Sequence, residues 1–204
     1  MILGTAARSG LNGRILARGL ARVFFLVGCF GASLFLAPWA RAEEASEYQV
    51  KAAFLYNFAK FIEWPADDSW KVEDPLTICV VGEDPFGAIL DDTVRGKTIA
   101  RHSVVIRRLK AGRSWKGCRI AFVSSSEKDD PSLNLASSTP AGVLTVGETK
   151  GFAARGGIIN FVVERDRVRF EVNVDAAERA GLKISSKLLS LAKIVRSQDP
   201  RGRS

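Results

Sequence analysis

Few side chains in this sequence are of the types that catalyse reactions. The one histidine, His102, follows Arg101 in a segment typical of a strand, where a solvated imidazole is a simpler interpretation than a general base. Two aspartate pairs, Asp91–Asp92 and Asp129–Asp130, fit solvated turns or helix caps better than an acid–base pair. The sequence contains no nucleophile elbow, phosphate-binding loop or zinc-protease motif. These observations predict a protein that is not an enzyme.

The cysteines and glycines offer a second kind of chemistry. Cys79 and Cys118 are the two cysteines that follow residue 42, and together with His102 they do not make a tetrahedral ligand set, so no metal site or cofactor is predicted. In an exported protein one such pair most simply forms a disulfide, and a redox-responsive thiol pair is the alternative. Gly156–Gly157 could cradle a phosphate, but glycines that permit an unusual backbone before a strand are the favoured interpretation.

Residues 1–42 have the pattern of a cleavable secretory signal peptide. Four arginines between residues 8 and 22 precede the apolar run Val23–Ala37, and Ala40–Arg41–Ala42 places small side chains where a signal peptidase cuts. The apolar run is shorter than the about 20 residues of a membrane-spanning helix. The mature chain should begin near Glu43 and work in the periplasm. A lipoprotein lipidated at Cys29 and an uncleaved membrane anchor are the alternatives.

The rest of the chain has the length of a single domain and a surface of mixed charge. The sequence has 204 residues, and removing the leader leaves one domain's worth, predicted as residues 43–196 with a polar tail at 197–204. The leader carries five arginines and no acidic residue, so its removal lowers the formal net charge from +8 to +3. Such a mixed surface does not predict a nucleic-acid partner.

The first predicted element is a helix over residues 47–64, ended by Pro65. Its apolar residues cover most of the circumference, so it should be buried on more than one side. Core packing can account for this, but we expect a homodimer or partner contact near Tyr56, Phe61 or Trp64.

Short apolar runs follow, with turns and short helical segments between them. Leu76–Val81 is typical of a strand covered on both faces, and Ser103–Leu109 of an edge strand. Two further short apolar strands are predicted at Arg119–Ser124 and Val143–Val146. The pattern predicts an α/β fold: a single domain with a central, mostly parallel sheet and helices on both faces.

The last third of the chain changes character. Ile158–Glu164 and Arg167–Val174 flank a two-residue turn, which predicts a C-terminal antiparallel hairpin. The apolar spacing of four residues then predicts a final helix: Ile184, Leu188, Leu191 and Val195.

Ligands of open α/β sheets bind beyond the carboxyl ends of the strands. The residues predicted there form a candidate crevice for a small molecule or cell-wall fragment: Gly82, Glu83, Asp84, Ser124, Ser125, Gly147 and Glu148. Their small and polar types also suit ordinary tight turns.

Several motifs, in order along the chain, resemble those of the YfiR-like family of exported proteins. The first is the run EYQVKAAFLYNFAKFIEWP over residues 47–65. The others are LTVG at 144–147, GFA at 151–153, GGIINF at 156–161, FEVN at 170–173, AA at 176–177, GLKISSKLL at 181–189 and LA at 191–192. The likeness covers nearly all of the predicted mature chain.

The resemblance implies a periplasmic α/β domain that tends to dimerise and that regulates a membrane enzyme. Members of the YfiR type bind the periplasmic sensor domain of an inner-membrane diguanylate cyclase and hold it inactive, which lowers cyclic di-GMP and biofilm growth. Cys79 and Cys118 match the family's principal disulfide, but a second cysteine pair around Ala153–Asn160 is missing. A periplasmic ligand-binding module that reports to another sensor is the alternative function.

Overall fold

The computed structural model describes residues 37–65, 70–71, 73–129, 135 and 139–197, with side chains from Ser46 onward. The chain divides into two units, residues 1–45 and 46–204. Most of the predicted leader, residues 130–134 and 136–138 and the tail from residue 198 lie outside the described residues. Among the described helices, none combines the length and apolar character that a membrane crossing needs.

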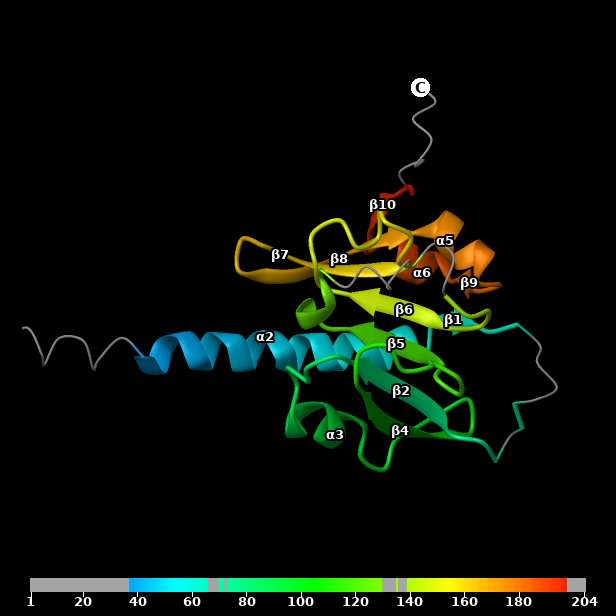
Figure 1. Ribbon diagram of the computed structural model, residues 1–204, viewed down its shortest axis with the longest axis horizontal. Coiled ribbons are helices and arrows are strands. Elements are labelled where there is room, and N and C mark those ends of the chain that lie inside the picture. Colours follow the sequence, from blue (N-terminus) through cyan, green and yellow to red (C-terminus); the bar gives the residue numbers. More distant parts are fainter. Residues whose placement is uncertain (1–36, 66–69, 72, 130–134, 136–138, 198–204) are drawn as a thin grey trace, which may run out of the picture. The chain divides into compact units, whose positions relative to one another are not determined.

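The second unit is built on an eight-stranded sheet with the order β10-β8-β7-β6-β5-β2-β4-β3 (Figure 1). Its central strands run parallel: β2 (Leu76–Val81), β4 (His102–Leu109), β5 (Ile120–Val123), β6 (Leu144–Gly147) and β7 (Ile159–Glu164). Short β3 (Thr98–Ile99) pairs antiparallel with β4. The predicted α/β class with a mostly parallel sheet is therefore confirmed.

The buried strands follow from their continuous apolar composition. All six residues of β2 and all four of β5 are buried, as expected for strands in the middle of a sheet that is covered on both faces. Strand β4 is more exposed and lies next to β3, so it is not the outermost strand that the sequence predicted. The two residues of β3 cover only the start of β4, where Thr98 and Ile99 pair with Ser103 and His102.

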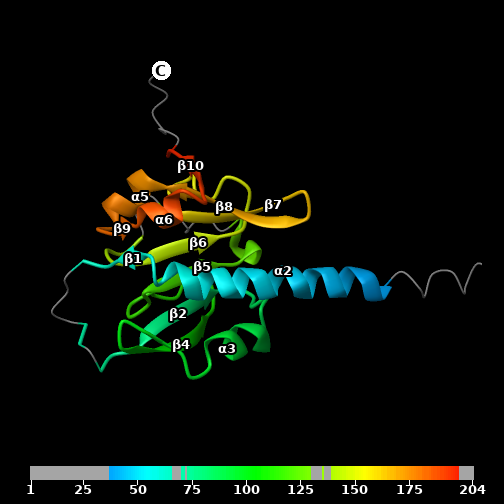
Figure 2. The same ribbon diagram turned by 180° about the vertical axis from the view of Figure 1, so that it is seen from behind.

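The main core lies between the sheet and the part of helix α2 (Ala37–Phe58) that follows Ser46, whose last turns cross the strands in Figure 2. Ala52, Leu55 and Phe58 are fully buried there. Phe58 packs against Phe161 of β7 and Phe170 of β8 (Arg167–Asn173), with ring centroids 5.7 and 5.1 Å away. Helix α3 (Ala88–Val94) adds buried Leu90 and Val94 to the same core.

The other face of the sheet carries two smaller apolar clusters. In one of them Phe152 is buried because two glycines make room for its ring: a Cβ at Gly147 would lie 2.5 Å from the ring, and one at Gly157 2.2 Å. The favoured interpretation of Gly156–Gly157 was an unusual backbone, and Gly156 does have a φ of 103°. Gly157 serves instead to admit a neighbouring aromatic ring.

The prediction of a C-terminal hairpin is confirmed, but the prediction of one final helix up to Val195 is wrong. Strands β7 and β8 pair antiparallel around Arg165–Asp166, both with positive φ. Helix α5 (Val174–Arg179) follows, capped by Asn173, and helix α6 covers only Ser186–Leu189. The chain then forms β10 (Lys193–Val195), because its β-branched residues pair parallel with β8 at the edge of the sheet.

The first helix also ends earlier than predicted, at Phe58 instead of Trp64. Ile62 and Glu63 form strand β1 and pair antiparallel with β9 (Lys183–Ile184) in a second, two-stranded sheet. This pairing with a segment more than 100 residues away ends the helix before Pro65 can, and local sequence carries no signal for it.

Candidate functional site

The predicted crevice lies where the order of the parallel strands reverses, between β2 and β5. Gly82 follows β2, and Ser124 caps a 3₁₀ turn, η1 (Ser125–Glu127), that lies over this point. A Cβ at Gly82 would lie only 2.4 Å from the Ser126 hydroxyl, and the Glu83 amide donates a hydrogen bond to that hydroxyl at 3.0 Å. The chain's own turn therefore packs across the switch point.

Two more of the predicted crevice residues, Ser125 and Glu148, belong to an ion-pair cluster. The Glu148 carboxylate accepts hydrogen bonds from Lys51 Nζ at 2.8 Å, from the Ser125 amide at 3.1 Å and from the Tyr48 hydroxyl at 3.2 Å. Lys51 also pairs with Glu47, one helical turn away on α2. The side chains of Lys51 and Glu148 are each 5% exposed. The cluster fastens α2 to the carboxyl end of β6.

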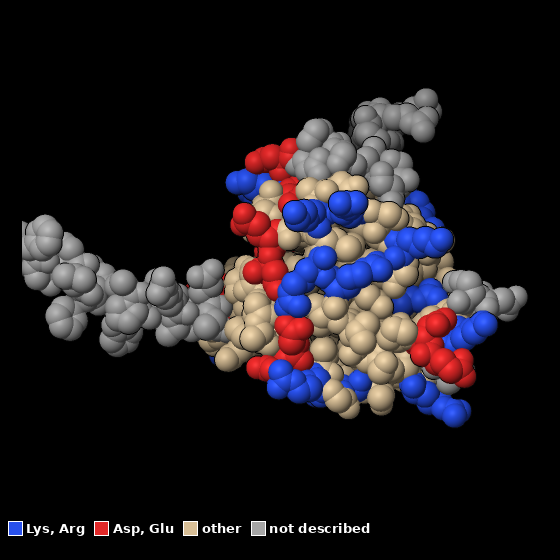
Figure 3. Space-filling view, turned by 60° about the horizontal axis from the view of Figure 1, so that its bottom comes forward, with Lys and Arg blue, Asp and Glu red and all other residues tan. Residues whose placement is uncertain are grey.

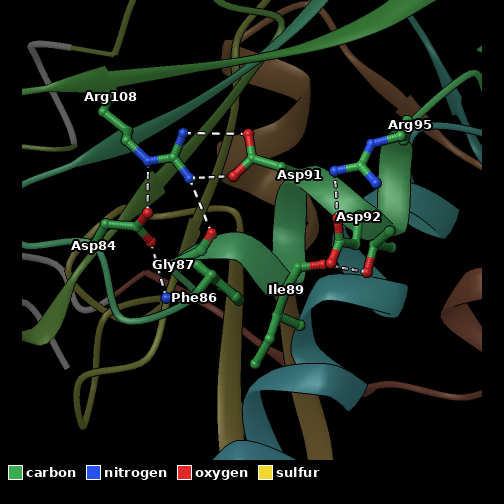
Figure 4. Close-up of polar contacts among 9 residues, drawn as sticks. Asp84, Phe86, Gly87, Ile89, Asp91, Asp92, Arg95 and Arg108 are labelled. Atoms are coloured by element: carbon green, nitrogen blue, oxygen red, sulfur yellow. Dashed lines mark hydrogen bonds and ion pairs between the residues drawn. The ribbon is translucent and has the colours of Figure 1, made fainter.

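Asp84, the remaining predicted crevice residue, belongs to a second network centred on Arg108 (Figure 4). The guanidinium donates to Asp84 at 2.6 Å, to Asp91 at 2.5 Å and to the Gly87 carbonyl at 2.9 Å. Its hydrogen bond holds the pKa of Asp91 below the ordinary value, and the two carboxylates raise the pKa of Arg108 above its ordinary value. This network ties β4 to the loop and helix that follow β2.

The single histidine is buried, with 8% of its surface exposed, so the expectation of a solvated imidazole is wrong. His102 stacks on Trp70 with ring centroids 4.0 Å apart, and its Nδ1 lies 2.7 Å from the Asp74 carbonyl oxygen, to which it can donate. The Arg119 guanidinium lies over Trp70 as well, 4.1 Å from the ring centroid. In the part of the chain that the structure describes, no three potential ligand side chains gather into a metal site. His102 therefore has a structural role here.

Cys79 and Cys118 form a disulfide, with Cα atoms 5.8 Å apart. It joins β2 to the residues just before β5, on the face of the sheet opposite α2. Both residues are buried, at 0% and 3% exposure. Arg107 donates hydrogen bonds to Cys118 Sγ at 3.0 Å and to the Lys116 carbonyl at 2.6 Å, so the bridge also has a polar neighbour.

The three aromatic residues predicted near a dimer contact are each partly buried against the main core. Tyr56 lies between the end of α2 and Lys97, whose ammonium is 4.7 Å from the ring centroid. Trp64 meets Trp70 edge to face at 6.0 Å. The outer surface of α2 near Tyr56 exposes Gln49, Val50 and Ala53.

Sequence reasoning missed the residues that complete these clusters. Lys51 was one polar residue on an apolar helix, and its partner Glu148 is 97 positions away. Two cavities among the described residues lie at the amino ends of the strands, at the opposite edge from the predicted crevice. One, of about 690 Å³, adjoins Leu76 and β3, and the other, of about 560 Å³, adjoins Thr77, Cys118 and Val143.

Comparison with known protein families identifies the family of this chain. The sequence matches the YfiR/HmsC-like family over residues 48–193. The match begins at Tyr48 in α2 and ends at Lys193, the first residue of β10. It includes every central strand and both cysteines of the disulfide. The chain belongs to the YfiR/HmsC-like family.

Proposed function

We propose that this protein is a non-catalytic periplasmic regulator. It binds the periplasmic sensor domain of an inner-membrane signalling protein, a diguanylate cyclase, and represses it, which lowers cyclic di-GMP and biofilm formation. The family match over residues 48–193 carries the proposal, because it spans almost the whole domain and not one motif.

Two further observations support it. The buried disulfide fits an oxidising compartment outside the cytoplasm. Figure 3 shows bands of lysine and arginine beside aspartate and glutamate on one face of the molecule, a mixed surface that suits a protein partner with charges of its own.

Deleting the gene should raise cellular cyclic di-GMP, because the cyclase loses its repressor. The nucleotide is measured by mass spectrometry in a strain that expresses the cognate cyclase, and in a second strain that also lacks the cyclase. The wild-type gene should restore the low level, and a version without residues 1–42 should not, since it stays in the cytoplasm. Unchanged cyclic di-GMP in the first strain, or full rescue by the leaderless version, would contradict the proposal.

The repressor acts as a homodimer in this proposal, with the contact at α2 near Tyr56, Phe61 and Trp64. The exposed surface of α2 beside Tyr56 carries Val50, 41% exposed, next to Gln49 and Ala53. This strip itself carries no charged side chain, although Lys60 and Lys97 lie over the neighbouring Tyr56 ring.

Light scattering on the mature protein at micromolar concentration should give twice the mass of one chain. Val50→Glu should give one chain's mass, because it places two carboxylates in the contact. The matched control is Val163→Glu on the hairpin, where Val163 is 52% exposed, and this variant should remain dimeric. A wild-type mass of one chain would refute the dimer.

A further inference from the structure

Arg107 lies beside the disulfide and has no carboxylate partner in the part of the chain that the structure describes. It is in register with Cys79 on the neighbouring strand β2, so both side chains lie on the face of the sheet opposite α2. The next residue, Arg108, differs, because Asp84 and Asp91 neutralise its charge. The buried Nε–H of Arg107 has no acceptor among the described residues. A half-buried cation of this kind attracts an anion placed next to it.

The guanidinium of Arg107 contacts one sulfur of the bridge. Its Nη2 donates hydrogen bonds to Cys118 Sγ at 3.0 Å and to the Lys116 carbonyl oxygen at 2.6 Å. The second bond holds the guanidinium against the turn that leads into Cys118. In the disulfide this sulfur is a weak, neutral acceptor. In the reduced protein it can lose its proton, and the same contact then joins a cation to a thiolate, which is the arrangement that stabilises reactive cysteines.

The two cysteines differ in their surroundings. Cys79 is inside β2 and 0% exposed, and no described residue donates a hydrogen bond to its Sγ. Cys118 lines the cavity of about 560 Å³, whose described lining residues do not include Cys79. The charged residues that line this cavity are Lys116, Arg119 and Asp74, two cations and one carboxylate. Burial without a donor disfavours a thiolate and nearby cations favour it, so the anionic form is favoured at Cys118 over Cys79.

We infer that Arg107 makes Cys118 the reactive thiol of the reduced protein, the site to which a disulfide oxidant attaches when the bridge forms. Arg107 acts as a positioning residue, because it stabilises the thiolate of Cys118 and takes no part in bond exchange. The inference goes beyond the proposed repression of a signalling protein. Its test uses the isolated protein, so the outcome does not depend on a partner.

Bridge formation then runs in two steps of thiol–disulfide exchange. The Cys118 thiolate attacks one sulfur of a small disulfide or of a dithiol oxidase in its disulfide form, and the other sulfur of the oxidant leaves as a thiolate. The Cys79 thiol then gives its proton to water, and its sulfur attacks Cys118 Sγ. The bond between Cys118 and the oxidant breaks, and the second half of the oxidant leaves as a thiolate. In total the cysteine pair loses two electrons and the oxidant gains them.

The same asymmetry protects the finished bridge. A reductant that enters the cavity meets the sulfur of Cys118, and attack there has to expel Cys79 as a thiolate buried in an apolar cluster. Expulsion of Cys118, the better leaving group, needs attack on Cys79, which is 0% exposed. Arg107 therefore favours formation of the bridge without making the bridge easy to reduce.

The test compares single thiols in the mature protein. Cys79→Ser leaves Cys118, Cys118→Ser leaves Cys79, and the ultraviolet absorbance of the thiolate is followed as the pH is raised. Cys118 should be half ionised about one pH unit or more below Cys79. Adding Arg107→Gln to Cys79→Ser should abolish most of this difference, and Arg107→Lys should retain part of it because it keeps the charge. The matched control Arg113→Gln removes an exposed cation from the loop between β4 and β5 and should leave the ionisation of Cys118 unchanged.

A second measurement does not need the single-cysteine variants. Reduced wild-type protein is mixed with oxidised glutathione and quenched with acid, and peptide mass spectrometry locates the mixed disulfide, which should be on Cys118. Circular dichroism establishes that each protein is folded under the conditions used. Three results would each overturn the inference: ionisation of Cys118 at the same pH as Cys79 or above it, unchanged ionisation of Cys118 after Arg107→Gln, or glutathione attached mainly to Cys79.

Discussion

Replacing Lys51 with methionine should lower the free energy of unfolding by about 3–5 kcal/mol, the usual cost of removing one partner from a buried ion pair. The loss arises because Glu148 would remain charged at 5% exposure and keep only the Tyr48 hydroxyl and the Ser125 amide as donors. Methionine keeps most of the apolar stem, so the measured loss reports the charge and not the packing. Urea unfolding of the mature protein, followed by circular dichroism, gives the value.

Two further variants separate the ion pair from a general sensitivity of the fold. Lys51→Met/Glu148→Gln should be more stable than Lys51→Met alone, since the neutral amide no longer leaves a buried charge without its cation. Arg95→Ala breaks the exposed pair with Asp92, whose side chains are 76% and 59% exposed, and should cost less than about 1 kcal/mol. A loss below 1 kcal/mol for Lys51→Met would show that this cluster does not fasten α2 to the sheet.

The part of the fold that could be predicted is the part that local pattern determines. Leu76–Val81 forms a strand because six consecutive apolar and β-branched residues fit a position covered on both faces. The hairpin could be predicted because two runs that favour strands flank Arg165–Asp166 and the second run alternates apolar and polar residues. The observed pairing, Glu164 with Arg167 and Val163 with Val168, closes the hairpin on that two-residue turn.

The errors fall where distant segments pair. The apolar spacing of residues 184–195 suits a helix as well as it suits two short strands, and pairing of Lys193–Val195 with β8 decides between them. Ile62–Glu63 has the same ambiguity and becomes a strand because Lys183–Ile184 lies beside it. Nothing within either segment encodes its partner.

The sequence predicted where the crevice residues lie along the strands, and a ligand in that crevice stays a prediction. Gly82, Ser124 and Glu148 do follow the parallel strands, as the strand pattern required. The packing of Ser126 against Gly82 and the hydrogen bonds of Lys51 and Tyr48 to Glu148 could not be predicted. These contacts join elements that are brought together only by folding. The cavity at the opposite edge depends likewise on β3 meeting the end of α2.

The disulfide should act as a structural bridge and not as a redox switch. Cys79→Ser should lower the free energy of unfolding by about 2–4 kcal/mol, the usual range for loss of a native bridge. The chain-entropy model gives about 4 kcal/mol for the sequence separation of 39 residues. Repression of the partner should weaken only as far as folded protein is lost.

A reductant should react slowly with the disulfide because both sulfur atoms are buried. Cys79 is 0% and Cys118 3% exposed, and Trp115 and Leu109 pack against them. Native protein titrated with mild reductant should therefore release no free thiols, and thiols should appear together with unfolding. Near-ultraviolet circular dichroism follows the fold in the same samples. If two thiols appeared at low reductant while the fold was retained and partner binding was abolished, Cys79 and Cys118 would be the sensor of the protein and not its staple.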